Sequence, residues 1–208
     1  MQNQSYANSN RPLLKRRAHR TTPHWVSLIL PCVVVVGACS FSTREPEPPI
    51  VEGGTYLQPD TPDQVIENLR FAIRELNTQN YRRSLAGDLF FQPTATAEAR
   101  DPIWSGWGLT EEEQYFSTLV AASTQSMGQD LELNDVSLVA VDERTSVLDA
   151  TYIFSVFHNR AEVPQVAQGQ LSWRLIQRED GLWVLQSWID QEIGAEPSWS
   201  DLKAAFGS

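Results

Sequence analysis

Few residues in this 208-residue sequence could bind a transition metal or form a cross-link. It contains only two cysteines, Cys32 and Cys39, and three histidines, His19, His24 and His158. It also lacks a Gly-rich phosphate loop, a nucleophile elbow and a paired-carboxylate spacing. We therefore expect no catalytic residues, no metal site and no cofactor, and enzymatic activity is an uncertain and less favoured interpretation.

The sequence also lacks an apolar run long enough to span a bilayer. The apolar residues from Trp25 to Val36 and their neighbours cover about 14 positions, where a spanning helix needs about 20, and Pro31 interrupts them. A basic stretch, Arg11 to Arg20, precedes this run, and two small residues follow it. These parts are typical of an export signal, so residues 1–38 are expected to be a cleaved signal peptide.

Four residues at the end of this segment, Val36-Gly37-Ala38-Cys39, resemble the lipobox of bacterial lipoproteins. The resemblance implies cleavage before Cys39, a diacylglyceryl thioether on its sulfur and acylation of the new amino terminus. Two or three acyl chains would anchor the protein stably in a lipid bilayer. Because Ser40 and not Asp follows, the resemblance implies the outer membrane, facing the periplasm. An ordinary secretory signal is the alternative.

Removal of residues 1–38 would leave a strongly acidic chain. Eleven Lys or Arg and 26 Asp or Glu follow position 38, a net charge of −15. Such a chain repels phosphate backbones, so nucleic acid is not an expected partner. Cys39 would be its only cysteine, which excludes an internal disulfide and a cysteine-based zinc site.

The remaining chain divides into a tether and a single α+β domain. Residues 39–60 are rich in Pro, Gly and charge, as in Arg44 to Pro49, and are expected to be a flexible tether. Residues 61–208 are expected to fold. Thr61-Pro62-Asp63-Gln64 predicts a helix start, with Val65, Leu69, Ala72 and Leu76 on its apolar face.

Several shorter elements follow this helix. A helical turn carrying Tyr81 and Leu85 is expected to end at Gly87, before a short strand at 89–91, and Thr110 to cap a second long helix. The apolar period then changes to two, which predicts four strands over 131–141, 147–157, 167–177 and 182–189. Trp199, Leu202 and Phe206 lie at helical spacing, and we expect a closing helix with Trp199 buried against the sheet.

This order of elements resembles the cone-shaped fold of the nuclear transport factor 2-like superfamily, which includes ketosteroid isomerase. The segments Thr61–Phe91 and Leu131–Asp190 carry the resemblance, as does the Trp-rich end shared with uncharacterised lipoproteins of this fold. It implies helices packed on a curved antiparallel sheet around a pocket. Enzymes of the superfamily perform acid–base chemistry in the cone, but none of their catalytic residues can be aligned with this chain.

Residues that could line such a pocket come from several segments. Trp104 and Trp107 lie in a Gly-containing loop and could form an aromatic lid, although core packing is the commoner fate of such residues. Asp149 and Asp190 lie on strands, and either would have a raised pKa if it pointed inward. His158 is more often a solvated turn residue at such a position. The pocket candidates are Trp104, Trp107, Tyr115, Asp149, His158 and Asp190.

Three hypotheses on function follow. The first is a membrane-tethered, non-enzymatic binding or accessory domain for an unknown small ligand or envelope protein. The second is a small-molecule isomerase, dehydratase or hydrolase that uses the same pocket. The third is a structural protein that forms a homodimer through its sheet face. Converging carboxylates inside the cone would favour the second hypothesis, and a large exposed apolar patch on the sheet the third.

Overall fold

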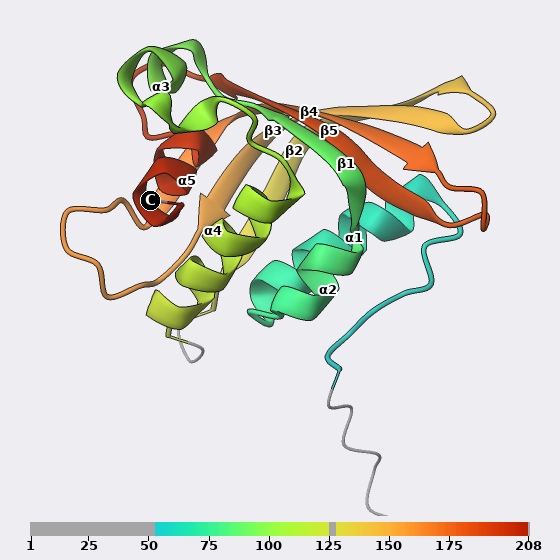
Figure 1. Ribbon diagram of the computed structural model, residues 1–208, viewed down its shortest axis with the longest axis horizontal. Coiled ribbons are helices and arrows are strands. Elements are labelled where there is room, and N and C mark those ends of the chain that lie inside the picture. Colours follow the sequence, from blue (N-terminus) through green and yellow to red (C-terminus); the bar gives the residue numbers. More distant parts are fainter. Residues whose placement is uncertain (1–52, 125–127, 208) are drawn as a thin grey trace, which may run out of the picture. The chain divides into compact units, whose positions relative to one another are not determined.

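The computed structural model of the chain describes residues 53–124 and 128–207 (Figure 1). The expected signal peptide, Cys39 and most of the expected tether lie outside these residues. Among the described residues, no helix has the length and apolar character needed to cross a bilayer.

The predicted first helix is confirmed as α1, Pro62–Arg74. The Thr61 amide donates to Gln64 Oε1 at 3.0 Å, as the cap predicted. Val65, Leu69 and Ala72 are almost fully buried. The short helix α2, Thr78–Arg83, follows.

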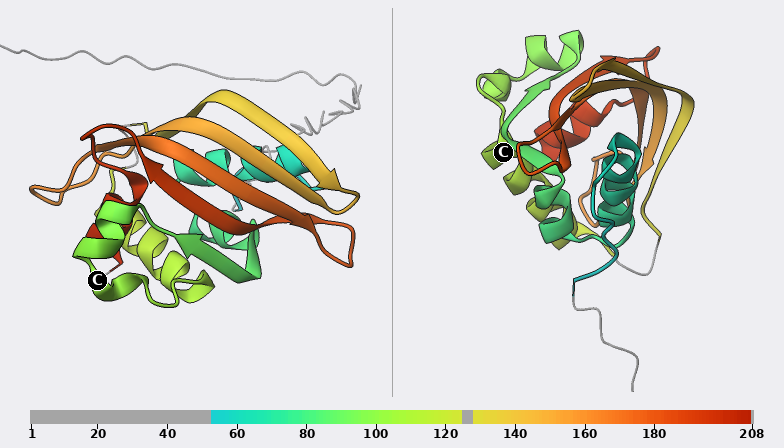
Figure 2. Two further views of the ribbon diagram at one scale, coloured as in Figure 1. Left: turned by 90° about the horizontal axis from the view of Figure 1, so that it is seen from above. Right: turned by 90° about the vertical axis from the view of Figure 1, so that its right-hand side faces the viewer.

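The five strands form one curved mixed sheet in the order β1-β5-β4-β3-β2 (Figures 1 and 2). They are β1 Leu85–Gln92, β2 Asp130–Asp142, β3 Thr145–Ser155, β4 Val166–Gln177 and β5 Trp183–Glu192. The four long strands are antiparallel and match the prediction closely, whereas β1 pairs in parallel with β5.

Two expected boundaries near the helices were wrong. Gly87 does not end a helix but lies inside β1, because that strand begins directly after α2, where Leu185 N donates to Ser84 O at 2.9 Å. The helix α4, Leu109–Ala122, begins before Thr110. Its N-cap is Gly108, whose amide donates to Glu111 Oε2 at 3.0 Å.

Two further elements complete the domain. The helix α3, Ala95–Arg100, and the 3₁₀ turn Pro102–Trp104 were not predicted. The predicted closing helix is confirmed as α5, Trp199–Phe206. The ribbon views place α1, α2, α4 and α5 over the same face of the sheet, and α3 beside α5 (Figures 1 and 2). Trp199, Leu202 and Phe206 are 1%, 0% and 0% exposed, as expected for a helix docked on a core.

Residues 53–60 belong to the folded unit, although the sequence suggested that the flexible tether extends to residue 60. Side chains from α1, α2 and the connection between them hold the backbone of residues 53–57. The carbonyl of Gly53 accepts from Asn77 Nδ2 and Asn80 Nδ2, both at 2.8 Å. We call these side chains (Asn68, Glu75, Asn77 and Asn80) the clasp.

The clasp also makes side-chain-to-backbone hydrogen bonds with Thr55 and Leu57. Thr55 N donates to Glu75 Oε2 at 2.8 Å, and Thr55 O accepts from Asn80 Nδ2 at 3.1 Å. The Asn68 amide group both accepts from Leu57 N, at 2.7 Å, and donates to Leu57 O, at 2.8 Å. These side-chain amides and the Glu75 carboxylate satisfy backbone groups that no strand pairs. The ordered domain therefore begins by Gly53.

Candidate functional site

Asp190 lies inside the cone, where the sheet meets the start of α5. Its side chain points inward from β5, and the residue is 1% exposed. Oδ1 accepts from Tyr152 OH at 2.8 Å, and Oδ2 accepts from Ser200 N at 2.8 Å and Ser200 Oγ at 2.6 Å. Tyr152 OH in turn accepts from Trp199 N at 2.7 Å. The carboxylate thus connects β3, β5 and the first turn of α5.

A second buried carboxylate, Glu112, lies on α4 and pairs with Lys203 of α5. Both side chains are 0% exposed. Glu112 Oε1 accepts from Tyr81 OH at 2.7 Å, and Oε2 accepts from Trp107 Nε1 at 2.8 Å and from the Lys203 ammonium group. The ammonium group also lies 3.9 Å from the ring centre of Trp188. It is therefore held by one carboxylate and by aromatic faces.

Burial controls the ionisation of these groups. Desolvation lowers the pKa of Lys203 to about 8, although Glu112 and Asp190 act in the opposite direction. Desolvation also raises the pKa of Asp190, against the hydrogen bonds from Ser200 and Tyr152. The pKa of Tyr81 is raised by burial and by the neighbouring Glu112. The interior thus contains two carboxylates and one amine whose charges depend on each other.

Glu112 and Lys203 are not among the site residues predicted from the sequence, although the sequence contains a signal for them. Lys203 lies between Trp199 and Phe206 at spacings of four and three residues, on the apolar face of α5. Glu112 precedes Tyr115 by three residues, a spacing that places both on one face of α4. A charged residue inside an apolar stripe predicts a buried ion pair, provided that both stripes face one core.

Trp104 and Trp107 do not form a lid, which corrects that interpretation. They are 7% and 2% exposed, and their ring centres lie 4.9 Å apart. Trp104 Nε1 donates to Ala97 O at 2.9 Å, so the unpredicted helix α3 supplies its acceptor. Both rings pack against Phe91 of β1. These indoles are part of the core.

Two other candidates also lie in the packed interior. Tyr115 is 0% exposed, and its hydroxyl accepts from Trp199 Nε1 at 2.9 Å, so it joins the network that includes Asp190. His158 is 7% exposed, which corrects the expectation of a solvated turn residue. Its Nε2 lies 3.1 Å from Pro164 O, and its ring makes a T-shaped contact with that of Phe206 at a centre distance of 5.0 Å. Phe206 of α5 thus covers one side of the imidazole.

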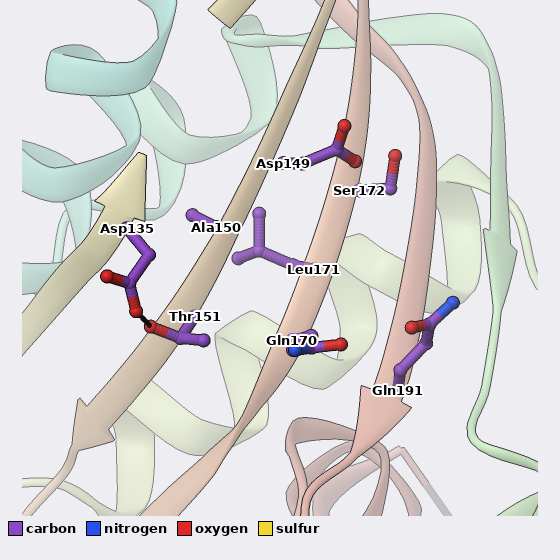
Figure 3. Close-up of a pocket in the computed structure, with 8 residues that line it drawn as sticks. All are labelled: Asp135, Asp149, Ala150, Thr151, Gln170, Leu171, Ser172 and Gln191. Carbon is purple, nitrogen blue, oxygen red and sulfur yellow. Dashed lines mark hydrogen bonds between the residues drawn. The ribbon is translucent and has the colours of Figure 1, made fainter. Parts of the chain in front are cut away.

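Asp149 points away from the cone, to the outer face of the sheet (Figure 3). It lies across from Ser172 in a surface hollow of about 280 Å³. In the same hollow, Thr151 Oγ1 donates to Asp135 Oδ2 at 3.2 Å. The hollow is lined by Asp135, Asp149, Ala150, Thr151, Gln170, Leu171, Ser172 and Gln191. Asp149 therefore has no part in the interior network.

The described residues contain no group of three or more His, Cys, Asp or Glu side chains placed to hold a metal ion. The interior network instead consists of Glu112, Lys203 and Asp190 with their hydroxyl and indole donors. Both oxygens of each carboxylate accept hydrogen bonds from the chain itself. Such an arrangement fixes α5 on the sheet and leaves its carboxylates already bonded.

Comparison with known proteins identifies the fold and nothing finer. No protein-family model and no curated protein matches the sequence. A Novosphingobium aromaticivorans protein provisionally named a scytalone dehydratase is similar in structure at a TM-score of 0.51 and 10% identity. The likeness covers 65% of this chain and 89% of that one.

A second protein from that organism, provisionally named an aromatic ring hydroxylase, has a TM-score of 0.50 at 9% identity, over 67% of this chain and 92% of its own. A nuclear transport factor 2-like superfamily protein of Salmonella enterica serovar Typhimurium scores 0.47 at 13% identity, over 65% of this chain and 87% of its own. The two Novosphingobium proteins, with TM-scores of 0.50 and 0.51, share the arrangement of helices packed on a curved sheet, and the expected α+β fold class is confirmed.

Proposed function

We propose that the protein is an exported lipoprotein, anchored through acyl chains on Cys39 in the outer membrane and facing the periplasm. Its domain serves there as a non-enzymatic binding or accessory module for a small ligand or an envelope protein. The anchor is supported by the basic segment, the apolar segment and the lipobox-like Val36-Gly37-Ala38-Cys39 in that order.

One observation carries the non-enzymatic part of the proposal. The two carboxylates inside the cone are both bonded to donors of their own chain, and Lys203 is fully buried against Glu112. A general acid or base must come within hydrogen-bond distance of a proton on its substrate. Here α5 occupies that space and supplies two of the donor residues, Ser200 and Lys203.

Lys203 offers a direct test, because it is the only lysine after Lys15. The lipidated protein is exposed at pH 8 to formaldehyde and a mild hydride donor, and methylation of Lys203 is followed by mass spectrometry. We expect methylation at least about a hundredfold slower than after unfolding, since the side chain reacts only when the structure opens. Arg174→Lys, at an exposed position of β4, provides a reactive control in the same molecule.

Rapid methylation of native Lys203 would mean that small molecules reach the interior. That result would overturn the inference that α5 fills the space beside the two carboxylates, and it would favour an enzyme.

The anchor has its own test. Bacteria that express the wild-type chain or Cys39→Ser are grown with labelled palmitate, and we expect label only in the wild-type protein. Equal labelling of both would disprove lipidation at Cys39.

A second candidate function, a small-molecule isomerase, dehydratase or hydrolase, is favoured by one observation. The buried indole Nε1 groups of Trp173 and Trp188 have no hydrogen-bond partner among the described residues. Buried donors without an acceptor are rare in proteins, and a bound carbonyl or hydroxyl compound could supply one. A thermal-shift screen of such compounds tests this candidate. Compounds that stabilise the wild type but not Trp173→Phe would support it.

A further inference from the structure

A surface groove lies between the first described residues and the turn that joins β4 to β5. It has a volume of about 660 Å³, within the range of small-molecule sites. Pro59 O accepts from Trp183 N at 2.8 Å, which fixes the first residues against the start of β5. The groove is lined by Tyr56, Gln58, Pro59, Arg83, Arg178, Asp180, Leu182 and Val184.

Arg83 gives the groove an unpaired cation. Its guanidinium carbon lies 3.2 Å from the ring centre of Tyr56, and it has no ion-pair partner among the described residues. A guanidinium group stacked on a ring keeps its N–H donors pointing sideways, where they can bind an oxyanion. Arg178 bonds Asp180 through Nε and Nη2, at 3.3 and 2.6 Å, and thus retains its Nη1 donors.

The charge of this groove differs from that of three other hollows on the described residues. Its lining charges sum to +1, from Arg83, Arg178 and Asp180. The three other hollows have lining charges of −2, 0 and −2. The charge is also unevenly distributed along the sequence. Residues 53–83 have a net charge of zero, whereas residues 84–208 have a net charge of −13. An anionic surface would therefore repel most of the domain but not this side.

The groove also adjoins the point where the chain leads toward Cys39. The clasp fixes residues 53–57, and Tyr56 is one wall of the groove. Thirteen residues, 40–52, separate Cys39 from Gly53, so an extended connection is at most about 45 Å long. A domain anchored at Cys39 can thus bring this groove to the lipid headgroups.

We propose that the groove binds the phosphate group of anionic phospholipids in the membrane that anchors Cys39. Arg83 and Arg178 donate to the phosphate oxygens, and Leu182 and Val184 contact the glycerol carbons. Binding turns the α2 side of the domain toward the bilayer and the acidic remainder away from it. This inference rests on the proposed lipid anchor.

The test measures orientation on vesicles with the full lipidated protein. Acylation of Cys39 leaves a single introduced cysteine, Gln79→Cys on α2 or Gln170→Cys on the outer sheet face, free for a fluorescent label. Energy transfer to labelled headgroups is compared on phosphatidylcholine vesicles with and without phosphatidylglycerol. We expect phosphatidylglycerol to raise transfer from position 79 and not from position 170.

Arg83→Gln should weaken this response about fivefold, the factor that corresponds to about 1 kcal/mol per arginine at an anionic surface. Arg174→Gln is the matched control, since Arg174 is exposed and without an ion pair in the described residues but lies on the outer face of β4. An equal effect of both changes, or no response to phosphatidylglycerol, would overturn the proposal.

A separate arm distinguishes lipid from free phosphate. If inorganic phosphate raises the melting temperature in an Arg83-dependent way while phosphatidylglycerol vesicles have no effect, the groove binds the free anion and the membrane proposal is wrong. A mass spectrum without acyl chains on Cys39 would signal failure of the anchor itself, independently of the groove.

Discussion

At the scale of single residues, the most unusual feature is Lys203, a lysine whose side chain has no exposed surface. Lys203 loses its hydration and recovers part of that cost from Glu112 and from the aromatic faces around it. A buried ion pair of this kind contributes little net stability compared with an apolar pair of similar size. Removal of one partner, however, leaves an unpaired charge in the core.

The ion pair yields a prediction for urea unfolding. Lys203→Met should lower the free energy of unfolding by about 3–5 kcal/mol, because Glu112 then stays buried without its cation. The double variant Glu112→Gln/Lys203→Met should cost clearly less than the sum of the two single changes. Additive losses would show that the two side chains do not interact energetically.

Lys203 also predicts how stability depends on pH. Its pKa is about 8 in the folded state and near 10.5 when unfolded, so between these values the unfolded chain holds more protons. The free energy of unfolding should therefore rise with pH between about 8 and 10. Above pH 10 the trend reverses, because burial raises the pKa values of Tyr81 and Tyr115 and the folded state keeps their protons.

Urea midpoints at pH 7, 8, 9 and 10 check this dependence, and Lys203→Met is the control. The variant should lack the rise between pH 8 and 10. A wild-type protein that loses stability in this interval would contradict the prediction.

Residue types alone did not reveal this site, and the reason is geometric. The sequence predicted that Asp190 gains a raised pKa if it points inward, and it does. It could not show that Asp149 points outward from β3, because alternation along a strand fixes relative and not absolute orientation. Glu112 and Lys203 required a further fact, that α4 and α5 face the same core.

A helix or strand could be predicted from the sequence when it was long and its apolar residues recurred at a clear period. The long strands and α1 have ten or more residues, and their apolar periods are clear. The helix α3 has six residues and one buried side chain, Ala97, so it has no measurable period. The clasp was missed for another reason. Its residues bond backbone groups more than ten positions away, and no local pattern encodes such bonds.

The clasp can be tested at Gly54, which has a φ of +67°. A Cβ atom at this position would lie 2.4 Å from Glu75 Oε2 and 2.5 Å from Asn77 Nδ2. Gly54→Ala should displace both side chains and speed hydrogen exchange at the amides of Thr55 and Leu57. Gly53→Ala is the matched control, because a Cβ there meets no atom within 4 Å. Equal exchange in both variants would refute the role of Gly54.

For the whole molecule, the main question is where the folding unit begins. A chain of residues 53–208 should unfold cooperatively, whereas 61–208 lacks the six clasp bonds and the Pro59–Trp183 bond. At about 0.5–1.5 kcal/mol for each bond, the shorter chain should be less stable by about 3 kcal/mol or more. Denaturant melts of the two chains measure the difference. Equal stability would restore residue 61 as the boundary.

The clasp also determines how the domain responds to a mechanical load. A pull on the chain before Gly53 reaches the bonds of Gly53 first, then those of Thr55 and Leu57, and finally the Pro59–Trp183 bond, so they break one after another. Sequential rupture needs less force than simultaneous rupture, and the helices and sheet stay folded while it proceeds. Once released, the eight residues 53–60 lengthen the connection by about 26 Å. Tension can therefore lengthen the connection between Cys39 and the domain, and the connection shortens again when the tension is released and the clasp re-forms.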